Sequence, residues 1–530
     1  MKKTNLLGYV SLALAGLCLS LIGPQTCNAA PGARDPIVSA EKNSFKEVTS
    51  RLDAGGDLYL YLSTKQMLGK LSEKVAQFQQ LCLAMSNVGD EQREKISRIF
   101  GVITNLITRS GVEDVSGVGM SSIQLEKGFY HNKLFVHHYP GQGQGFLWKL
   151  CGTNPHFLGA LDLLPSNTAL AMFSDLNLPL LWSVIQKQAD ESGFPQAEGL
   201  METLPEKFEE ATGLTLDHAL GSLGGEFGLV LTLDESTMIP LPLPTKEPLQ
   251  IPEPALMLVV KVNDSTIFDR IDQELEAKMP QGVVKVDKPN LKMRTVAIPL
   301  PLPIELRPTI AQSEGYLFLA SSDHLIKEAL AVRDGQKPGI RSTDEFKHLA
   351  KDIPTEGNDF TFCSGRLGKT ILELERKALP LLSHGPHGPN PRAVAIPLLS
   401  SPSANFGYSV GANTGEGWFC VGNGNQGPGK LLAVAAVVPA AVAAAIAMPA
   451  IAKAKASAQR TACLSNLRRI DNAKKQWAQD NNKPGDAAPT MEDLKPYLHG
   501  KLRCPSGGHY TIGAVDEPAR CSMHSRHQRR

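Results

Sequence analysis

Five segments of the chain repeat one pattern, and this repetition constrains the fold more than any other feature. In each segment, a short apolar run typical of a strand is followed by a polar turn and then by apolar residues at helical spacing. Residues 255–262 are such a run, Asn263-Asp264-Ser265 is the turn, and Ile267 to Leu275 has the helical spacing. The other four runs lie at residues 57–62, 168–173, 316–319 and 359–363. The pattern predicts an α+β protein with a mixed α/β body of repeated strand-helix units.

The predicted body covers residues 31–425, and its shared pattern suggests internal duplication. We divide it into a first half, residues 31–235, and a second half, residues 236–425. Residues 426–482 are predicted to form a linker and a long helix, which is apolar and Ala-rich at first and then amphipathic. Residues 483–530 are predicted to form a small α+β headpiece that contains cysteines.

The N-terminus has the features of a secretory signal peptide. Lys2 and Lys3 precede an uncharged apolar run from Leu6 to Gly23, and Cys27-Asn28-Ala29 then places small residues before a cleavage site. We therefore expect residues 1–30 to be a signal peptide and the body to be exported to the periplasm. The alternative is an uncleaved membrane anchor.

A second apolar segment, Leu431 to Ala452, contains no charged residue and is long enough to cross a bilayer. Its many alanines and its two prolines, Pro439 and Pro449, weaken the case for insertion. Small residues suit packing against other membrane helices. We expect this segment to associate with the inner membrane or its helices, which places the protein in the cell envelope.

The charge of the chain excludes two broad classes of protein. The sequence has 54 Lys and Arg against 53 Asp and Glu, and only 20% of its residues are charged. This composition fits neither a disordered chain nor a uniformly basic nucleic-acid binder, so we expect no nucleic-acid partner. From Lys453 onward, 15 basic residues stand against 7 acidic ones, so the C-terminal stretch is basic.

No complete catalytic constellation is present in the sequence. Gly221 to Gly225 is not followed by the Lys-Ser/Thr pair of a phosphate-binding loop. Four further cysteines lie in separate apolar contexts: Cys82, Cys151, Cys363 and Cys420. We predict that the protein is not an enzyme and needs no cofactor.

The C-terminal stretch has the most specific motifs. Residues 449–456 read Pro-Ala-Ile-Ala-Lys-Ala-Lys-Ala, and residues 462–471 read Ala-Cys-Leu-Ser-Asn-Leu-Arg-Arg-Ile-Asp. Apolar residues continue at helical spacing to Trp477, and the helix is predicted to end near Asn481. Residues 504–510 then read Cys-Pro-Ser-Gly-Gly-His-Tyr. Together these motifs resemble those of bacterial type II secretion pseudopilins and type IV pilin-like proteins.

The resemblance covers about 100 of the 530 residues and implies a long helix, in a membrane or filament core, that carries a small β headpiece. The chain departs from the family at the processing site. The family has Gly followed by Phe, with Glu at the fifth position, whereas Gly429 is followed by Lys430 and the fifth position is Val434. The helix is also internal, so we describe this part as pilin-like. The N-terminal body resembles, more loosely, uncharacterised bacterial envelope proteins with repeated strand-helix units.

Two interpretations of the C-terminal cysteines stay open, because they depend on the side of the membrane that this part occupies. In an exported headpiece, Cys504 and Cys521 are candidates for a disulfide, which is the interpretation we favour. In the cytoplasm, Cys504, Cys521 and His524, with Cys463 or His509 as a fourth ligand, are a weaker candidate for a zinc site.

These features predict a non-enzymatic protein of the cell envelope. We expect a pseudopilin-like accessory component, with secretion-system or pilus proteins as its partners. The alternative is a periplasmic binding module that takes an apolar ligand or peptide and is tethered by its C-terminal helix.

Overall fold

The computed structural model describes residues 43–84, 89–241, 249–279, 281–296, 306–382, 405–428, 459–460, 462–498 and 502–523. The predicted signal peptide and the apolar segment Leu431 to Ala452 lie outside these residues. The chain divides into two compact units. One is the body, Gly32–Ala433, and the other contains the tail, Val434–Arg530.

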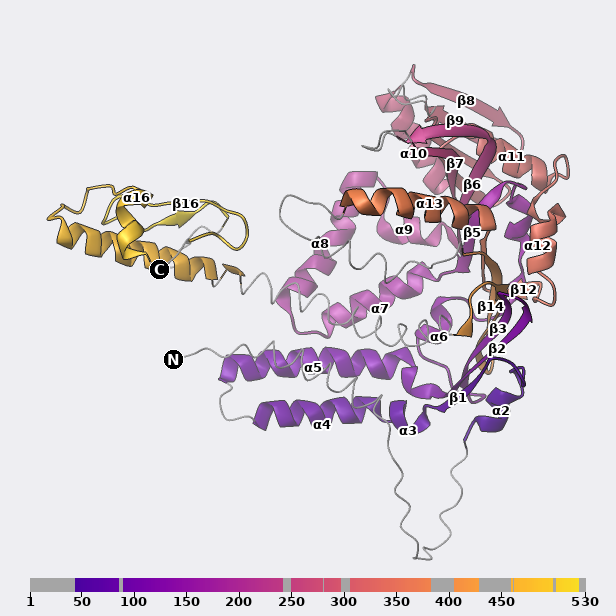
Figure 1. The fold of residues 1–530 in the computed structure, drawn as a ribbon, viewed down its shortest axis with the longest axis horizontal. Coiled ribbons are helices and arrows are strands. Elements are labelled where there is room, and N and C mark those ends of the chain that lie inside the picture. The colour runs from indigo at the N-terminus through magenta and orange to yellow at the C-terminus, as the bar shows by residue number, and fades with distance from the viewer. Residues whose placement is uncertain are drawn as a thin grey trace, which may run out of the picture. The chain divides into compact units, whose positions relative to one another are not determined.

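Most strands of the body belong to one large sheet (Figure 1). They are β1 (Leu58–Ser63), β2 (Val115–Glu126), β3 (Phe129–His138), β5 (Thr168–Asp175), β6 (Leu223–Leu241), β7 (Leu249–Val262), β8 (Val283–Lys288), β9 (Leu291–Val296), β10 (Thr309–Ser313), β11 (Tyr316–Ala320), β13 (Asp359–Cys363), β14 (Gly407–Thr414) and β15 (Gly417–Gly424). Within the described residues, the 13 strands lie in the order β1-β2-β3-β15-β14-β13-β5-β6-β7-β11-β10-β9-β8. Two short strands, β4 (His156–Phe157) and β12 (Glu356–Gly357), pair with each other separately.

All five predicted strand-helix units are confirmed, because β1, β5, β7, β11 and β13 are each followed by a helix. The helices of the body are α2 (Phe45–Thr49), α3 (Lys65–Leu68), α4 (Leu71–Ala84), α5 (Asp90–Ser110), α6 (Leu147–Leu150), α7 (Leu178–Asp190), α8 (Pro195–Thr212), α9 (Leu216–Gly221), α10 (Thr266–Lys278), α11 (Asp323–Arg333), α12 (Asp344–Leu349) and α13 (Gly365–Leu382). The described part of the body also contains three short 3₁₀ helices: η1 (Val112–Asp114), η2 (Gly159–Leu163) and η3 (Ile340–Ser342).

Every neighbouring pair in the large sheet is antiparallel, so the body belongs to the α+β class. Paired helices explain this direction for two of the units. Helix α4 packs against α5, and α7 packs against α8. The first helix of each pair leads the chain away from the end of the sheet, and the second leads it back to the same end. Strand β2 therefore runs antiparallel to β1, and β6 runs antiparallel to β5.

The repetition is visible in the topology of the sheet. Three blocks consist of a strand, then helical structure, then two strands, the first of which pairs with the starting strand: β1-β2-β3, β5-β6-β7 and β13-β14-β15. Residues 31–235 and 236–425 both contribute to this sheet. Strands β13 to β15 lie between β3 and β5, and β6 runs across the boundary between the two predicted halves.

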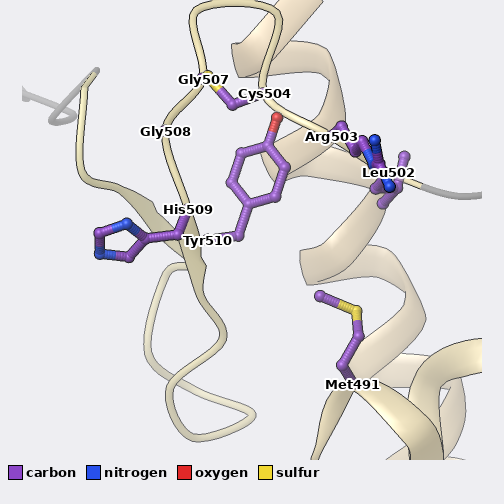
Figure 2. A pocket seen from close by; sticks show the side chains of 8 residues that line it. All are labelled: Met491, Leu502, Arg503, Cys504, Gly507, Gly508, His509 and Tyr510. Atoms are coloured by element: carbon purple, nitrogen blue, oxygen red, sulfur yellow. The ribbon is translucent and has the colours of Figure 1, made fainter. Parts of the chain in front are cut away.

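The tail consists of a helix over residues 462–480 and a small headpiece. The headpiece contains α16 (Met491–Leu494), η4 (Lys495–Tyr497), β16 (Tyr510–Thr511) and β17 (Arg520–Cys521). Figure 2 shows β16 and the loop that leads into it from Leu502. The predicted helix is confirmed over these residues and ends close to the predicted position. Among the described residues, no helix has both the length and the apolar character that a membrane span requires.

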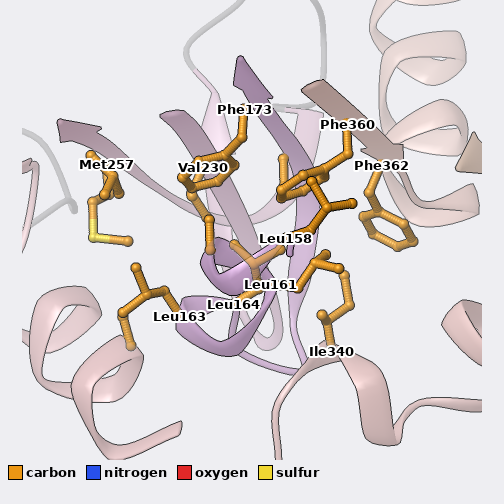
Figure 3. Close-up of a cluster of buried hydrophobic side chains, with 14 of the residues drawn as sticks. Leu158, Leu161, Leu163, Leu164, Phe173, Val230, Met257, Ile340, Phe360 and Phe362 are labelled. Atoms are coloured by element: carbon orange, nitrogen blue, oxygen red, sulfur yellow. The ribbon is translucent and has the colours of Figure 1, made fainter. Parts of the chain in front are cut away.

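Body and tail each have a hydrophobic core. In the body, inward residues of the central strands, such as Phe173, Val230 and Phe360, pack against η2 (Figure 3) and against residues of α11 and α12. Figure 1 shows α11 and α12 on this side of the sheet and α10 and α13 on the other. The buried residues of the tail core are Cys463, Leu467, Ile470, Ala473, Leu494, Cys504, Ala519 and Cys521.

Candidate functional site

Three cysteines from separate segments of the tail meet in its core. Cys463 lies in the first turn of the helix over residues 462–480, Cys504 lies in the loop before β16, and Cys521 ends β17. The Sγ atoms of Cys463 and Cys504 are 3.8 Å apart, and those of Cys504 and Cys521 are 3.6 Å apart. All three sulfurs lie within 4.8 Å of one another, and all three residues are buried. We refer to these residues as the cysteine cluster.

Ordinary packing rules place two of the three cysteines, Cys463 and Cys521. Cys463, Leu467, Ile470 and Lys474 follow one another at spacings of four, three and four residues, so they share one side of the helix. The hydrophobic effect buries that side under the headpiece. Pairing of β16 with β17 then sets Cys521 opposite Tyr510, which packs against the same core.

The loop after Cys504 supplies polar groups to its sulfur. Burial by itself raises the pKa of Cys504, but hydrogen bonds from the backbone N–H groups of Ser506 and Gly508, and the neighbouring thiols, lower it to about 6. Burial and the thiol of Cys521 raise the pKa of Cys463 to about 12. These effects make Cys504 the more acidic thiol of the two.

A buried lysine holds the loop that precedes β17. The side chain of Lys474 is fully buried, and its Nζ donates to the carbonyl oxygens of Ile512 and Ala514 at 2.9 Å and to that of Glu517. Nζ also lies 3.4 Å from Oδ1 of Asp471. The same carboxylate oxygen accepts a hydrogen bond of 2.8 Å from the backbone N–H of Ala519, two residues before Cys521. These bonds fix the position of the third cysteine.

The structure brings together Cys463, Cys504 and Cys521 of the predicted cysteine sites and does not bring His509 to them. The side chain of His509 is exposed, and Figure 2 shows its ring on the opposite side of the strand from Tyr510. A hollow of about 270 Å³ lies beside the cluster and is lined in part by Cys504 and Tyr510 (Figure 2). His524 lies outside the described residues.

The predicted disulfide partners, Cys504 and Cys521, are neighbours in space. Their sulfurs are 3.6 Å apart, whereas a disulfide bond is about 2.05 Å long. No disulfide bond joins Cys504 to Cys521 in the structure, and the disulfide stays a prediction. The sulfur of Cys463 is almost as close to that of Cys504, at 3.8 Å. Cys504 could therefore form a disulfide with either Cys463 or Cys521, and the remaining cysteine would stay outside the bond.

The body contains a polar cluster that the sequence did not reveal. Asp175 at the end of β5 accepts hydrogen bonds from Asn358 Nδ2 at 2.9 Å and lies 3.1 Å from His156 Nε2. Asn358 in turn accepts a bond of 2.8 Å from the backbone of Asn413. Burial, and then repulsion by Asp175, raises the pKa of the adjacent Asp359. These residues come from four distant segments, so only the position of Asp175 and Asp359 at strand ends hints at them.

We interpret this polar cluster as structural. Its bonds join loops to strand ends. The pKa of the Cys151 thiol is raised by burial and then by Asp359 and Asp175, which disfavours a nucleophilic thiolate. The remaining body cysteines are likewise poor nucleophiles. Burial raises the pKa of Cys82, and it raises that of Cys363 to about 11 and that of Cys420 to about 12.

One strip of the large sheet exposes apolar side chains. Met172, Leu229, Leu258 and Leu319 lie in register on β5, β6, β7 and β11 and form a continuous row. Met172 is 47% exposed, Leu258 46% and Leu319 38%, whereas Leu229 is half-buried. The strand residues on one side of the row pack against α13, and those on the other side pack against α10. We refer to these four residues as the apolar row.

Comparison of the chain with models of protein families, with curated proteins and with solved structures finds no match. The functional interpretation therefore depends on the structure itself, and its two main features are the cysteine cluster of the tail and the apolar row of the body. Both are interpreted below from their own geometry.

Proposed function

We propose that the protein is a non-enzymatic component of the cell envelope that acts with a secretion system or pilus. Its body would be exported to the periplasm, and its tail would be the pilin-like part. The observation that carries this proposal is the architecture of the tail, in which a small headpiece is folded onto one side of one amphipathic helix. The pilin-like resemblance implies the same combination of elements.

The opposite side of the tail helix supports a role in binding partners. Arg468, Arg469 and Lys475 are exposed there. Such a basic surface suits an acidic protein surface or anionic lipid headgroups. In the sequence, this helix follows closely on Leu431 to Ala452, whose small residues suit close packing against membrane helices. In our proposal, the apolar segment joins the membrane and the basic surface faces the partner.

The proposal is tested by crosslinking in cells, with partners identified by mass spectrometry. The full chain is compared with a chain that ends at residue 428, with the double variant Arg468→Glu, Lys475→Glu, and with the body control Lys187→Glu, Lys207→Glu. We expect the full chain and the body control to crosslink to secretion or pilus proteins of the inner membrane. The shortened chain and the tail variant should lose these crosslinks.

Either of two results would contradict the proposal. The full chain would form no crosslink to secretion or pilus proteins, or the chain that ends at residue 428 would keep all of them. The second result would move the binding surface to the body.

The apolar row favours one alternative function, a periplasmic module that binds an apolar ligand or peptide. Exposed apolar side chains scattered singly are common, but a row in register across four strands is a contiguous surface. Binding there would bury side chains such as Leu258, which is 46% exposed. The energetic gain would come from removing apolar area from water.

The alternative is tested with the fluorescent probe anilinonaphthalene sulfonate and the full chain. Leu258→Ser should weaken binding of the probe severalfold, while Leu81→Ser, which changes an exposed leucine of α4, should not. Equal binding by the wild type and Leu258→Ser would rule out the apolar row as the binding surface.

A further inference from the structure

We propose that Cys463, Cys504 and Cys521 hold a zinc ion that fastens the headpiece to the tail helix. The proposal does not depend on the function proposed above. It rests on the placement of three sulfur atoms, on the groups around them and on the small size of the tail core.

The distances between the sulfurs match those of zinc ligands. Zinc binds thiolates at about 2.3 Å in a tetrahedral arrangement, and the edge of such a tetrahedron is about 3.8 Å long. The observed distances are 3.8 Å from Cys463 to Cys504 and 3.6 Å from Cys504 to Cys521. The third pair also lies within 4.8 Å. A zinc ion can therefore enter between the sulfurs with little movement of the chain.

A disulfide explains the same cluster less completely. A bond between Cys504 and Cys521 would shorten their distance from 3.6 Å to about 2.05 Å. It would also leave Cys463, which is fully buried, as a spare thiol at the same point. A disulfide uses two cysteines, whereas many structural zinc sites contain three or four.

The surroundings of Cys504 resemble those of a metal-bound thiolate. The backbone N–H groups of Ser506 and Gly508 donate hydrogen bonds to its sulfur, and metal ligands in proteins commonly have such hydrogen-bond partners. A side chain at position 508 would crowd the site, because its Cβ would lie 2.9 Å from the sulfur of Cys521. The described residues supply three of the four ligands that a tetrahedral zinc ion takes.

The tail is small enough to need such a link. Its core has eight buried residues, and units with little core commonly depend on a disulfide or a metal. A zinc ion at this point would join the start of the helix, the loop before β16 and the end of β17. The zinc ion would thus crosslink the three segments that meet in the core of the tail.

The test is metal binding by the full chain, purified under reducing conditions. Elemental analysis should find about one zinc ion per chain. Titration of the metal-free protein with Co²⁺ should give the visible absorption of tetrahedral cobalt thiolate. We expect each of three variants to weaken Co²⁺ binding by more than about 100-fold: Cys463→Ser, Cys504→Ser and Cys521→Ser. Loss of a group that only hydrogen-bonds a ligand already costs about 10- to 100-fold in metal affinity, and loss of a ligand costs more.

Cys420→Ser is the matched control, because Cys420 lies in β15 of the body and is not one of the three clustered cysteines. This variant should bind the metal like the wild type. The wild-type titration keeps the test decisive if a cluster variant fails to fold. The proposal is overturned if the reduced wild-type protein binds neither zinc nor Co²⁺ in stoichiometric amount. It is also overturned if Cys420→Ser alone abolishes binding.

Discussion

At the residue scale, Lys474 shows how a charge is accommodated inside a small core. Its ammonium group is surrounded by three carbonyl oxygens and by Asp471, so its charge is compensated inside the core. The sequence predicted the helix that carries Lys474 but gave no sign that this residue is buried. Its carbonyl partners lie about 40 residues later in the chain, and helical spacing reports nothing about them.

Lys474→Met should therefore destabilise the tail by about 3 kcal/mol, because it leaves buried carbonyl groups and Asp471 without their partner. The matched control is Lys475→Met at the adjacent, exposed position, which should change the stability little. Hydrogen exchange of peptides from residues 462–480 measures the effect. Equal rates of hydrogen exchange in the two variants would show that the buried ammonium group does not contribute to the stability of the tail.

Asp359 gives a prediction on pH. Burial, and then repulsion by Asp175, raises its pKa above the ordinary value of 3.8. The folded state therefore holds the proton more tightly than the unfolded state, and this contribution to stability is present below pH 3.8 and lost as the pH rises through the folded pKa. Asp359→Asn should raise the thermal midpoint of the body at pH 7 and change it less near pH 4. Asp190→Asn, on α7, is the control. A lower midpoint for Asp359→Asn at pH 7 would contradict the account.

At the scale of elements, the sequence predicted what is local and missed what is not. Apolar periodicity correctly placed the five strands and the helices after them, because each pattern needs only neighbouring residues. The antiparallel direction and the strand order depend on partners far along the chain, as in β3, which pairs with β15. The same limit applies to the sites. The Cys504 motif was recognisable, whereas the polar cluster around Asp175 is assembled from distant segments.

The two faces of the sheet should respond differently to truncation. Phe360 is buried and stacks on Phe173 with ring centres 5.0 Å apart, so Phe360→Ala should cost about 4 kcal/mol. Met172 lies on the opposite, exposed face of the neighbouring strand, and Met172→Ala should cost less than about 1 kcal/mol. Urea unfolding followed by circular dichroism compares the two. If Met172→Ala lowered the free energy of unfolding more than Phe360→Ala, our assignment of the core face of the sheet would be wrong.

At the scale of the whole molecule, the chain has two compact units with separate cores. The body presents an apolar row on a large antiparallel sheet, and the tail presents a cysteine cluster under a small headpiece. We propose that the two units have different roles: the body is exported, and the tail binds partners at the membrane. This account depends first on whether the body is outside the cytoplasm.

Protease accessibility of the body in bacterial spheroplasts tests that claim most directly. We predict that protease added outside intact spheroplasts digests the body, residues 43–428, while a cytoplasmic marker protein stays whole. Replacing Lys2 and Lys3 and interrupting the apolar run after them with charged residues should prevent export and protect the body. A body that is digested only after the membrane is broken would contradict the account.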